Sequence, residues 1–262
     1  MIHLICYMIT FFACVMGTIC GMGGGIIIKP VLDATGVMSV AAITFLSGCT
    51  VISMSCWNVG KNILKKESVL DLKNTSFLAI GAAAGGLTGK QIYTSVASLF
   101  TDQNTAGGVQ ACLLLVATFA TFLYTLKKDK IKSKEITSPI AGIIIGILLG
   151  ILGSFLGIGG GPFNVAVLYY FFSMPTKKAT QNSLLIVLFS QLTSTLKTVI
   201  FDGIPGVQFS ILAGMILLGI IGSETGRRIN KRLSNQQATF LFECAMVLIM
   251  CINVYNIIKF LH

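Results

Sequence analysis

Long stretches of this chain carry no charged residue. Examples are Ile136–Ile151, Phe163–Met174 and Phe209–Ser223. A run of about 20 apolar residues is enough to cross the roughly 30 Å hydrocarbon core of a bilayer. Only 11% of the residues are charged and 54% are hydrophobic, whereas soluble domains have about 25% charged residues. The sequence therefore predicts an all-α, multi-pass protein of the cell membrane, with the lipid bilayer as its surroundings.

The net charge of +10 does not indicate nucleic-acid binding. The basic residues lie in short loops between apolar segments, where they act as determinants of membrane topology. A polar surface with basic residues and interleaved aromatics is missing from the sequence. We therefore expect no nucleic-acid partner.

The eight cysteines are scattered through apolar stretches without a CxxC pair. This distribution favours small buried hydrophobic residues over disulfides or zinc ligands. We expect no metal site and no cofactor. The cysteines are Cys6, Cys14, Cys20, Cys49, Cys56, Cys112, Cys244 and Cys251.

The chain repeats itself at an offset of 136 residues, since Gly17–Gly25 (GTICGMGGG) matches Gly153–Gly161 (GSFLGIGGG) glycine for glycine. Such a duplication defines the architecture. It predicts a first repeat over residues 1–126, a basic cytoplasmic linker over 127–137 and a second repeat over 138–262. The same register pairs Thr44 with Thr180, Ser47 with Ser183, Asn58 with Ser194 and Lys61 with Lys197, and one residue later Gly85-x-x-x-Gly89 matches Gly222-x-x-x-Gly226.

Each repeat contains five hydrophobic segments. The second segment of each, 24–35 and 161–173, is only about 11–13 residues long, or 16–20 Å of helix. It is too short to cross alone and follows a glycine-rich break, which predicts a half-helix whose tip stops inside the bilayer. The other segments are 2–20, 38–60, 72–96 and 104–126 in the first repeat and 138–157, 178–200, 206–226 and 237–260 in the second.

Charges in equivalent loops predict opposite orientations for the two repeats. Lys61, Lys65, Lys66 and Lys73 surround the loop after the third segment of the first repeat, whereas the equivalent loop near Asp202 has no basic residue. In the next pair of equivalent loops, after the fourth segment of each repeat, the second repeat has the basic residues and the first has none. The positive-inside rule then makes the halves inverted repeats with both termini outside, together with Asp33, Asp102 and Asp202. The alternative has four spans per half, with the halves parallel.

The glycine runs and the segments after them resemble the TauE/SafE sulfite exporter family, which includes permeases of the 4-toluene sulfonate uptake type. The residues that carry the resemblance are Lys29-Pro30-Val31-Leu32 and Lys178-Ala179-Thr180-Gln181-Asn182-Ser183-Leu184. The resemblance covers nearly the whole chain and implies a carrier of sulfite, sulfonates or related small organic anions. The sequence departs from equivalence where Phe45-Leu46 replaces the polar Gln181-Asn182, so the two halves need not contribute equally.

The glycine runs also predict the substrate site. Irregular backbone is tolerated at membrane depth only against protein or a water-filled cavity, and two half-helix N-termini near the midplane suit an anion. Close helix packing is the alternative role of the glycines. We expect valine at Gly24 or Gly160 to impair anion binding more than folding. The predicted substrate-binding residues are Gly23, Gly24, Gly25, Gly159, Gly160, Gly161, Asn164, Ser47, Gln181, Asn182 and Ser183.

Hydroxyl residues recur on one face of segment 178–200, where they either line the transport path or bond back to helix carbonyls. Among the charged residues, Lys29 is expected to pair with Asp33 near the outer surface, and Glu224 with Arg227 and Arg228. Glu243 lies inside an apolar segment. It is a candidate proton-coupling group, unless it pairs with Lys231 or Arg232.

The sequence contains no HExxH, GxSxG or P-loop motif, so we expect neither an enzyme nor ATP-driven transport by this chain alone. The leading hypothesis is a secondary anion transporter that works by alternating access. The alternatives are a membrane-embedded redox protein and a structural membrane subunit. Oligomerisation is compatible with all three.

Overall fold

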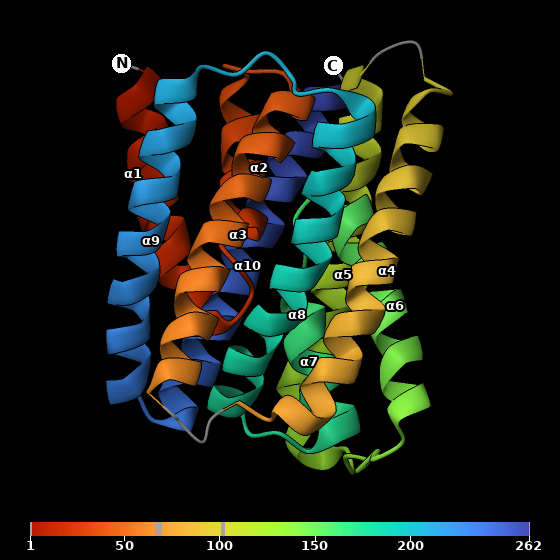
Figure 1. The fold of residues 1–262 in the computed structure, drawn as a ribbon, viewed down its shortest axis with the longest axis vertical. Helices are drawn as coiled ribbons and strands as arrows, with labels where there is room; N and C mark the ends of the chain where they lie inside the picture. The colour runs from red at the N-terminus through yellow and green to blue at the C-terminus, as the bar shows by residue number, and fades with distance from the viewer. Residues whose placement is uncertain (1, 66–69, 101–102, 262) are drawn as a thin grey trace.

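The computed structural model describes residues 2–65, 70–100 and 103–261. Over these ranges the chain forms α-helices, one short 3₁₀-helix and one π-helix, without a β-strand. Figure 1 shows them as a single bundle. The all-α prediction is thereby confirmed. The α-helices are α1 (Ile2–Cys20), α2 (Gly25–Thr35), α3 (Val40–Leu64), α4 (Leu72–Ala97), α5 (Gln103–Lys127), α6 (Pro139–Phe155), α7 (Pro162–Phe172), α8 (Thr176–Lys197), α9 (Phe209–Arg232) and α10 (Asn235–Leu261).

Helix ends follow local sequence signals. At the start of α3, the Ser39 hydroxyl accepts a hydrogen bond from the Ala42 N–H at 3.3 Å, which satisfies a free donor of the first turn. Pro139 and Pro162 occupy the first positions of α6 and α7, where the missing proline N–H has no helical partner to lose. Gly36 ends α2 with φ of 65°, the left-handed conformation common at helix C-termini.

Two helical hairpins, α1–α2 and α6–α7, reverse at the glycine runs. Gly21 and Gly157 have φ of 68° and 70°, and Gly23 and Gly159 have φ of 71° and 70°. Glycine adopts these left-handed conformations without the steric cost of a Cβ. The helices α2 and α7 have 11 residues each, or about 16 Å. Figure 1 places both reversals near the middle of the bundle, as the two predicted half-helices require.

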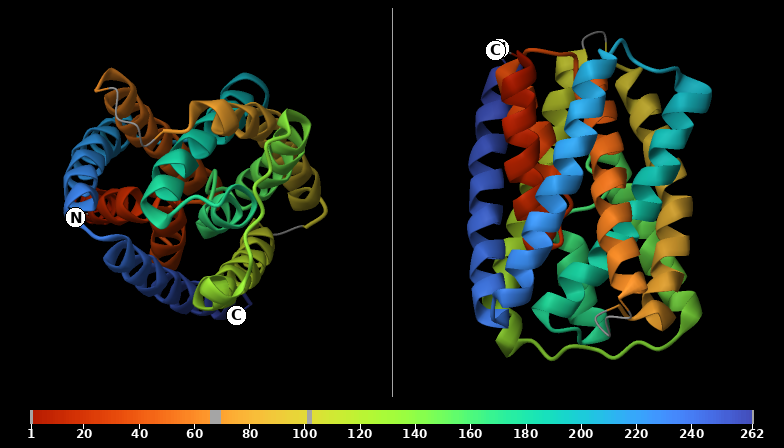
Figure 2. Two further views of the ribbon diagram at one scale, coloured as in Figure 1. Left: turned by 90° about the horizontal axis from the view of Figure 1, so that it is seen from below. Right: turned by 60° about the vertical axis from the view of Figure 1, so that its left-hand side comes forward.

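The two halves of the chain run through the bundle in opposite directions. Both termini lie at one end, and the linker before α6 crosses the other end (Figure 1; Figure 2, right). Equivalent helices exchange partners between the halves: α1 packs against α9 and α4 against α6, while α2 contacts α10 and α7 contacts α5. The relation of the two halves as inverted repeats stays a prediction.

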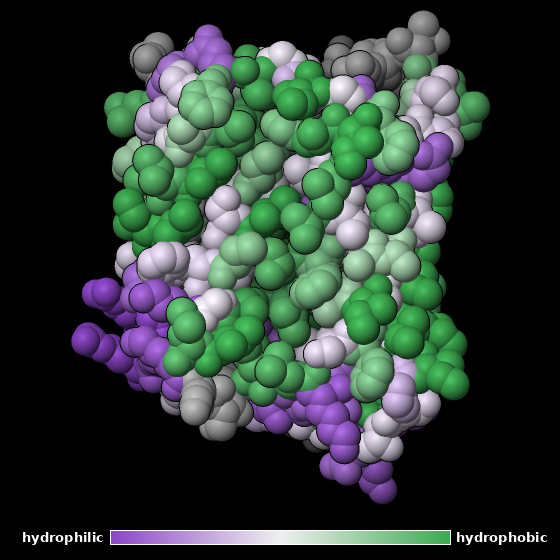
Figure 3. Space-filling model, in the orientation of Figure 1, coloured by the Kyte–Doolittle hydropathy of each residue, from purple (hydrophilic) through white to green (hydrophobic). Residues whose placement is uncertain are grey.

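The outside of the bundle suits lipid. Within the described ranges, six helices are long and apolar enough to cross a membrane by length and composition: α1, α3, α5, α9, α10, and α8 with the π-helix that follows it. The helices α6 and α7 are shorter and apolar. Leu148, Leu217 and Phe240 are more than half exposed. Figure 3 shows hydrophobic residues over most of one face, with hydrophilic residues gathered mainly toward its lower part. The chain is a multi-pass membrane protein.

Basic residues gather at the end of the bundle that holds the linker. Of the 18 basic residues within the described ranges, 14 belong to this end. The other four lie on helices in the half nearer the termini: Lys29, Lys90, Lys197 and Lys259. The positive-inside rule predicts that the linker end faces the cytoplasm, and we name it the inner end and the opposite one the outer end. Asp33 and Asp202 belong to the outer half, whereas Asp102 lies outside the described residues.

The prediction that all cysteines are buried is wrong for half of them. Cys6, Cys14 and Cys20 are buried and Cys49 is partly buried, but Cys56, Cys112, Cys244 and Cys251 are exposed. In an apolar helix the lipid-facing and protein-facing sides have similar composition, so hydrophobicity alone does not distinguish them. All eight cysteines are free thiols.

Candidate functional site

The two glycine breaks have matching internal geometry. A Cβ built at Gly17 would lie 2.6 Å from the Gly24 nitrogen, and one at Gly153 would lie 2.8 Å from the Gly160 nitrogen. In each half, a glycine near the end of the first helix therefore packs directly on the backbone of its own turn. A side chain at either position would push the turn away from the helix, which explains one pair of repeated glycines.

The tips of the two hairpins meet near the middle of the bundle. Val187 of α8 lies between them: its Cγ1 is 3.2 Å from where a Cβ at Gly23 would lie, and its Cγ2 would overlap a Cβ at Gly160. A Cβ at Gly25 would lie 3.1 Å from the Ile158 carbonyl oxygen. The N-terminal ends of α2 and α7 are therefore neighbours, and their partial positive charges converge.

Each tip also packs against the third helix of the opposite half. A Cβ at Gly21 would overlap the backbone of Thr180 in α8, and one at Gly157 would lie 3.1 Å from Thr44 Cγ2 in α3. Thr44 and Thr180 occupy equivalent positions in the duplication. The two hairpins are therefore held by equivalent neighbours from the other half.

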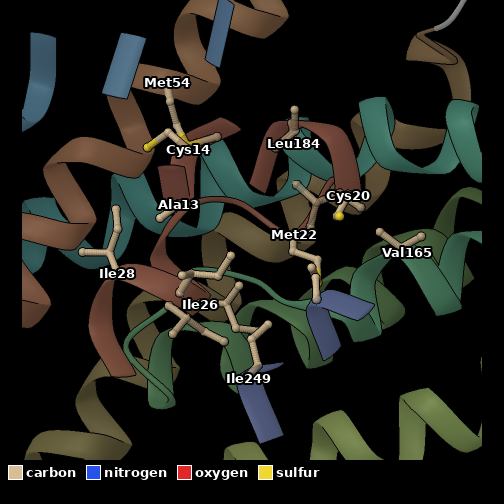
Figure 4. Packing of buried hydrophobic residues seen from close by; sticks show 14 of the residues in the cluster. Ala13, Cys14, Cys20, Met22, Ile26, Ile28, Met54, Val165, Leu184 and Ile249 are labelled. Atoms are coloured by element: carbon tan, nitrogen blue, oxygen red, sulfur yellow. The ribbon is translucent and has the colours of Figure 1, made fainter. Parts of the chain in front are cut away.

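The tips are more tightly packed than the sequence suggests. A Cβ at Gly24 would lie 2.8 Å from Cys14 Sγ, and the Gly24 N–H points to Met54 Sδ at 3.2 Å. Figure 4 shows Cys14 and Met54 close together among the buried residues. Because Val187 also fills the space beside Gly160, valine at either glycine would disturb packing as well as any bound ligand.

Three buried polar side chains near the tips have atoms without a hydrogen-bond partner among the described residues: Ser47 Oγ, both amide atoms of Asn164, and Gln191 Oε1. The Ser47 oxygen lies 3.1 Å from the position of a Cβ at Gly25, and the Asn164 nitrogen 2.6 Å from that at Gly160. The three residues are at most 3% exposed. Buried polar groups are nearly always paired, so these atoms are suited to a ligand or water.

Two of the other polar candidates of α8, Gln181 and Asn182, bond to neighbouring segments. Gln181 accepts a hydrogen bond from the Asn62 amide at 3.0 Å, and Asn182 accepts one from the Asp71 N–H at 2.8 Å, just before α4. Ser183 is fully buried, and its hydroxyl has no partner among the described residues. Asn182 therefore fixes the start of α4 rather than a glycine tip.

The hydroxyl face of α8 has both expected roles: some hydroxyls bond to helix carbonyls, and some line open space. Thr180 donates to the carbonyl three residues earlier at 2.9 Å, and Thr198 donates to the Ser194 carbonyl at 3.3 Å. Ser190 bonds to the Ser154 hydroxyl of α6 at 3.2 Å. Ser194 and Thr198 also line a cavity, so the same face both stabilises the helices and borders open space.

A cavity of about 360 Å³ lies in the outer half of the bundle. Its walls come from α3, α4, α8 and the segment between α8 and α9, and its polar lining includes Thr44, Lys90, Tyr93, Gln191, Thr195 and Asp202. Gln191 also borders the second glycine tip, because a Cβ at Gly159 would lie 2.9 Å from Gln191 Cβ. Gln191 therefore separates the inner wall of the cavity from the second hairpin tip.

Two predicted ion pairs are present. Lys29 Nζ lies 2.8 Å from Asp33 Oδ2, with side-chain exposures of 4% and 5%, so the pair is buried rather than near the surface. Glu224 lies 3.0 Å from Arg227 and 2.8 Å from Arg228. The first pair stabilises α2 inside the bundle, and the second lies at the inner end of α9.

Glu243 of α10 is partly exposed. Both its coupling role and its pairing with Lys231 or Arg232 stay predictions. No group of three His, Cys, Asp or Glu side chains within residues 2–65, 70–100 and 103–261 is placed to hold a metal ion.

Sequence reasoning missed Gln191 and Lys90. Gln191 lies four residues after Val187 and therefore shares the buried face of α8, a spacing that identifies it in retrospect. Lys90 directly follows the Gly85-x-x-x-Gly89 motif, as Arg227 follows the matching motif in the second half. That register marks both as equivalent positions at opposite ends of the bundle.

Comparison with known proteins agrees with this architecture. A family model described as "Sulfite exporter TauE/SafE" matches residues 6–253, a range that includes both hairpins and all residues of the candidate site. No curated protein and no solved structure matches the chain. The chain belongs to the TauE/SafE sulfite exporter family and is a membrane transporter.

Proposed function

We propose that this protein is a secondary carrier for a small anion, with sulfite or an organosulfonate as the best-fitting substrate. The observation that carries the proposal is the meeting of the N-terminal ends of α2 and α7 beside buried, unpartnered polar atoms. Helix N-termini present free N–H groups and partial positive charge. Together they stabilise an anion without a buried cation at the tips.

Ser47 and Asn164 complete this site. Ser47 belongs to α3 of the first half and lies beside the first glycine tip. Asn164 belongs to α7 of the second half and lies beside the second glycine tip. A hydroxyl and an amide N–H both donate to sulfonate or sulfite oxygens. Glycines 23–25 and 159–161 keep Cβ atoms out of the space between these donors, so the ligand contacts the backbone directly.

Alternating access follows from the exchange of helices between the halves. Residues 1–126 and 138–262 act as inverted repeats, and the site lies where their hairpins meet. Rocking of one set of packed helices against the other then opens the site to one side of the membrane at a time. The outer cavity and its Gln191 wall represent the outward path in this arrangement.

Transport by reconstituted protein tests the proposed substrate class. Purified protein in proteoliposomes is expected to take up ³⁵S-labelled sulfite or methanesulfonate saturably, with each anion inhibiting the other and acetate inhibiting weakly. Empty liposomes provide the control. If none of a panel of sulfur oxyanions and organic acids is transported faster than into empty liposomes, the proposal fails.

Replacing Asn164 with alanine is expected to weaken substrate affinity by about 10- to 100-fold. The reason is that a hydrogen bond to a charged group contributes roughly 1.5–3 kcal/mol, and each 1.4 kcal/mol is tenfold in affinity. Asn182→Ala is the matched control, because its amide bonds to the start of α4. It should lower thermal stability with little change in affinity. Equal affinity losses in both variants would contradict the assignment of Asn164 to the site.

A further inference from the structure

The outer cavity is lined by one lysine and one carboxylate among the described residues, Lys90 and Asp202. Lys29 pairs with Asp33 and Lys197 with Asp202, each at 2.8 Å. Asp202 therefore has its ion-pair partner in Lys197, which leaves Lys90 as the lining cation without an ion pair among the described residues.

Lys90 has no carboxylate partner among the described residues. The contact found for its ammonium is with the Tyr93 ring, 5.5 Å from the ring centroid. A cation over an aromatic face is stabilised, but its charge is not neutralised. An anion that enters the cavity therefore meets an available ammonium group in a partly enclosed space, where screening by water is weaker than at a surface.

Local structure explains why Asp202 forms its ion pair with Lys197 and not with Lys90. After α8, residues Thr198–Asp202 form a π-helix. Its i→i+5 bonding pattern places residues five apart on the same side. Lys197 and Asp202 are five apart and form their own pair at 2.8 Å. The Asp202 carboxylate thus has its partner on the adjacent turn.

The equivalent position in the other half is neutralised. In the register that matches Gly89 with Gly226, Lys90 corresponds to Arg227. The Arg227 guanidinium pairs with Glu224 at 3.0 Å, but the residue equivalent to Glu224 is Leu87. The duplication thus retains a cation at both ends and a carboxylate partner only at the inner end.

The inner wall of the cavity connects this charge to the hairpin tips. Gln191 is 3% exposed, and its Oε1 has no partner among the described residues. Its amide borders Gly48, whose Cβ would lie 2.6 Å from Gln191 Nε2, and its side chain borders Gly159. Gln191 therefore lies between the outer cavity and the second glycine tip.

We propose that the outer cavity is an anion-capture site, in which the Lys90 ammonium binds a small oxyanion such as sulfite or a sulfonate before Gln191 admits it to the glycine tips. The proposal rests on the proposed carrier function and deepens it, because it assigns a charged residue to substrate capture on one face. The capture site then acts on the outer face of the membrane and leaves the inner face unaffected.

Transport from each face tests this assignment. Whole cells report the outer face and inverted vesicles the inner face, with ³⁵S-sulfite as the probe. Lys90→Met is expected to raise the half-saturating sulfite concentration about 10-fold or more at the outer face, roughly the loss of one charge-assisted contact. At the inner face, the half-saturating concentration of Lys90→Met should differ from wild type by less than about twofold. Lys90→Arg keeps the charge, so its half-saturating concentration at the outer face should stay within about threefold of wild type.

Lys259→Met is the matched control. It removes a positive charge from the same half of the bundle, but Lys259 bonds to the Asp33 and Ala34 carbonyls at the end of α2 and does not line the cavity. Its outer-face half-saturation should match wild type. An unchanged outer face in Lys90→Met, an equal shift at both faces, or an equal shift in Lys259→Met would overturn the capture site.

Thermal stabilisation of detergent-purified protein separates this proposal from the carrier function. Sulfite and methanesulfonate should stabilise the wild type, and Lys90→Met should need about tenfold more anion for the same shift. Stabilisation of the wild type that Lys90→Met loses, without any transport, would support the capture site and refute the carrier. Transport with equal stabilisation of both proteins would refute the capture site alone.

Discussion

Replacing Lys29 with methionine is expected to destabilise the protein by about 3–5 kcal/mol, because it leaves Asp33 buried without its partner. Both side chains are at most 5% exposed, and Asp33 Oδ1 already lacks a hydrogen bond among the described residues. Methionine keeps the length of the side chain, so the loss of charge dominates. The unfolding midpoint of detergent-purified protein measures the effect.

Two further variants test whether the unpaired buried charge causes the loss of stability in Lys29→Met. Lys29→Met with Asp33→Leu removes both charges and should regain most of the lost stability, because a buried ion pair contributes little over an apolar pair of similar volume. Lys197→Met should cost less than Lys29→Met, because its partner Asp202 is 27% exposed and stays partly hydrated. A double variant as unstable as Lys29→Met would contradict this explanation.

Alanine at two equivalent glycines is expected to have unequal effects. Gly21 and Gly157 both have left-handed backbone, with φ of 68° and 70°, so either substitution costs about 1–3 kcal/mol in strain. At Gly21 the new Cβ would overlap the backbone of Thr180, whereas at Gly157 it would lie 3.1 Å from the ends of the Lys29 and Thr44 side chains. Because the new Cβ is overpacked against backbone, Gly21→Ala should lose about 1–3 kcal/mol more stability than Gly157→Ala.

The control is a glycine whose replacement causes neither backbone strain nor overpacking. Gly206 has open space around its Cβ position and no left-handed backbone, so Gly206→Ala should retain wild-type stability. The yield of folded protein and its unfolding midpoint are the readouts. Equal losses for Gly21→Ala and Gly157→Ala would show that backbone strain alone decides these positions, contrary to the packing described for the tips.

Most helices could be predicted from the sequence, because charge and glycine mark their ends. The half-helices expected over 24–35 and 161–173 were found over Gly25–Thr35 and Pro162–Phe172. Three boundaries differed more: α3 ends at Leu64 instead of 60, α9 continues to Arg232 instead of 226, and α8 passes into a π-helix at Thr198. Charged side chains at the inner end of α9 remain helical because they reach the aqueous boundary.

Side-chain partners were harder to predict than helices. Asn182 has its partner Asp71 at a sequence separation of 111 residues, and no local pattern reports such a contact. The glycine runs were recognised because their spacing repeats, but their packing depends on Cys14, Met54 and Val187, which are apolar residues without a distinguishing pattern. The two glycine breaks could thus be predicted from the sequence, whereas the polar side chains around them depended on tertiary structure.

Counterflow is the most direct measurement of the central claim, which is that one chain binds a small anion between its hairpins and exposes it alternately to each side. Proteoliposomes are loaded with unlabelled methanesulfonate and diluted into medium with a trace of labelled methanesulfonate. A carrier produces a transient accumulation of label above equilibrium, which Asn164→Ala should slow strongly. Label that rises only to equilibrium, without an overshoot at any internal concentration, would contradict alternating access.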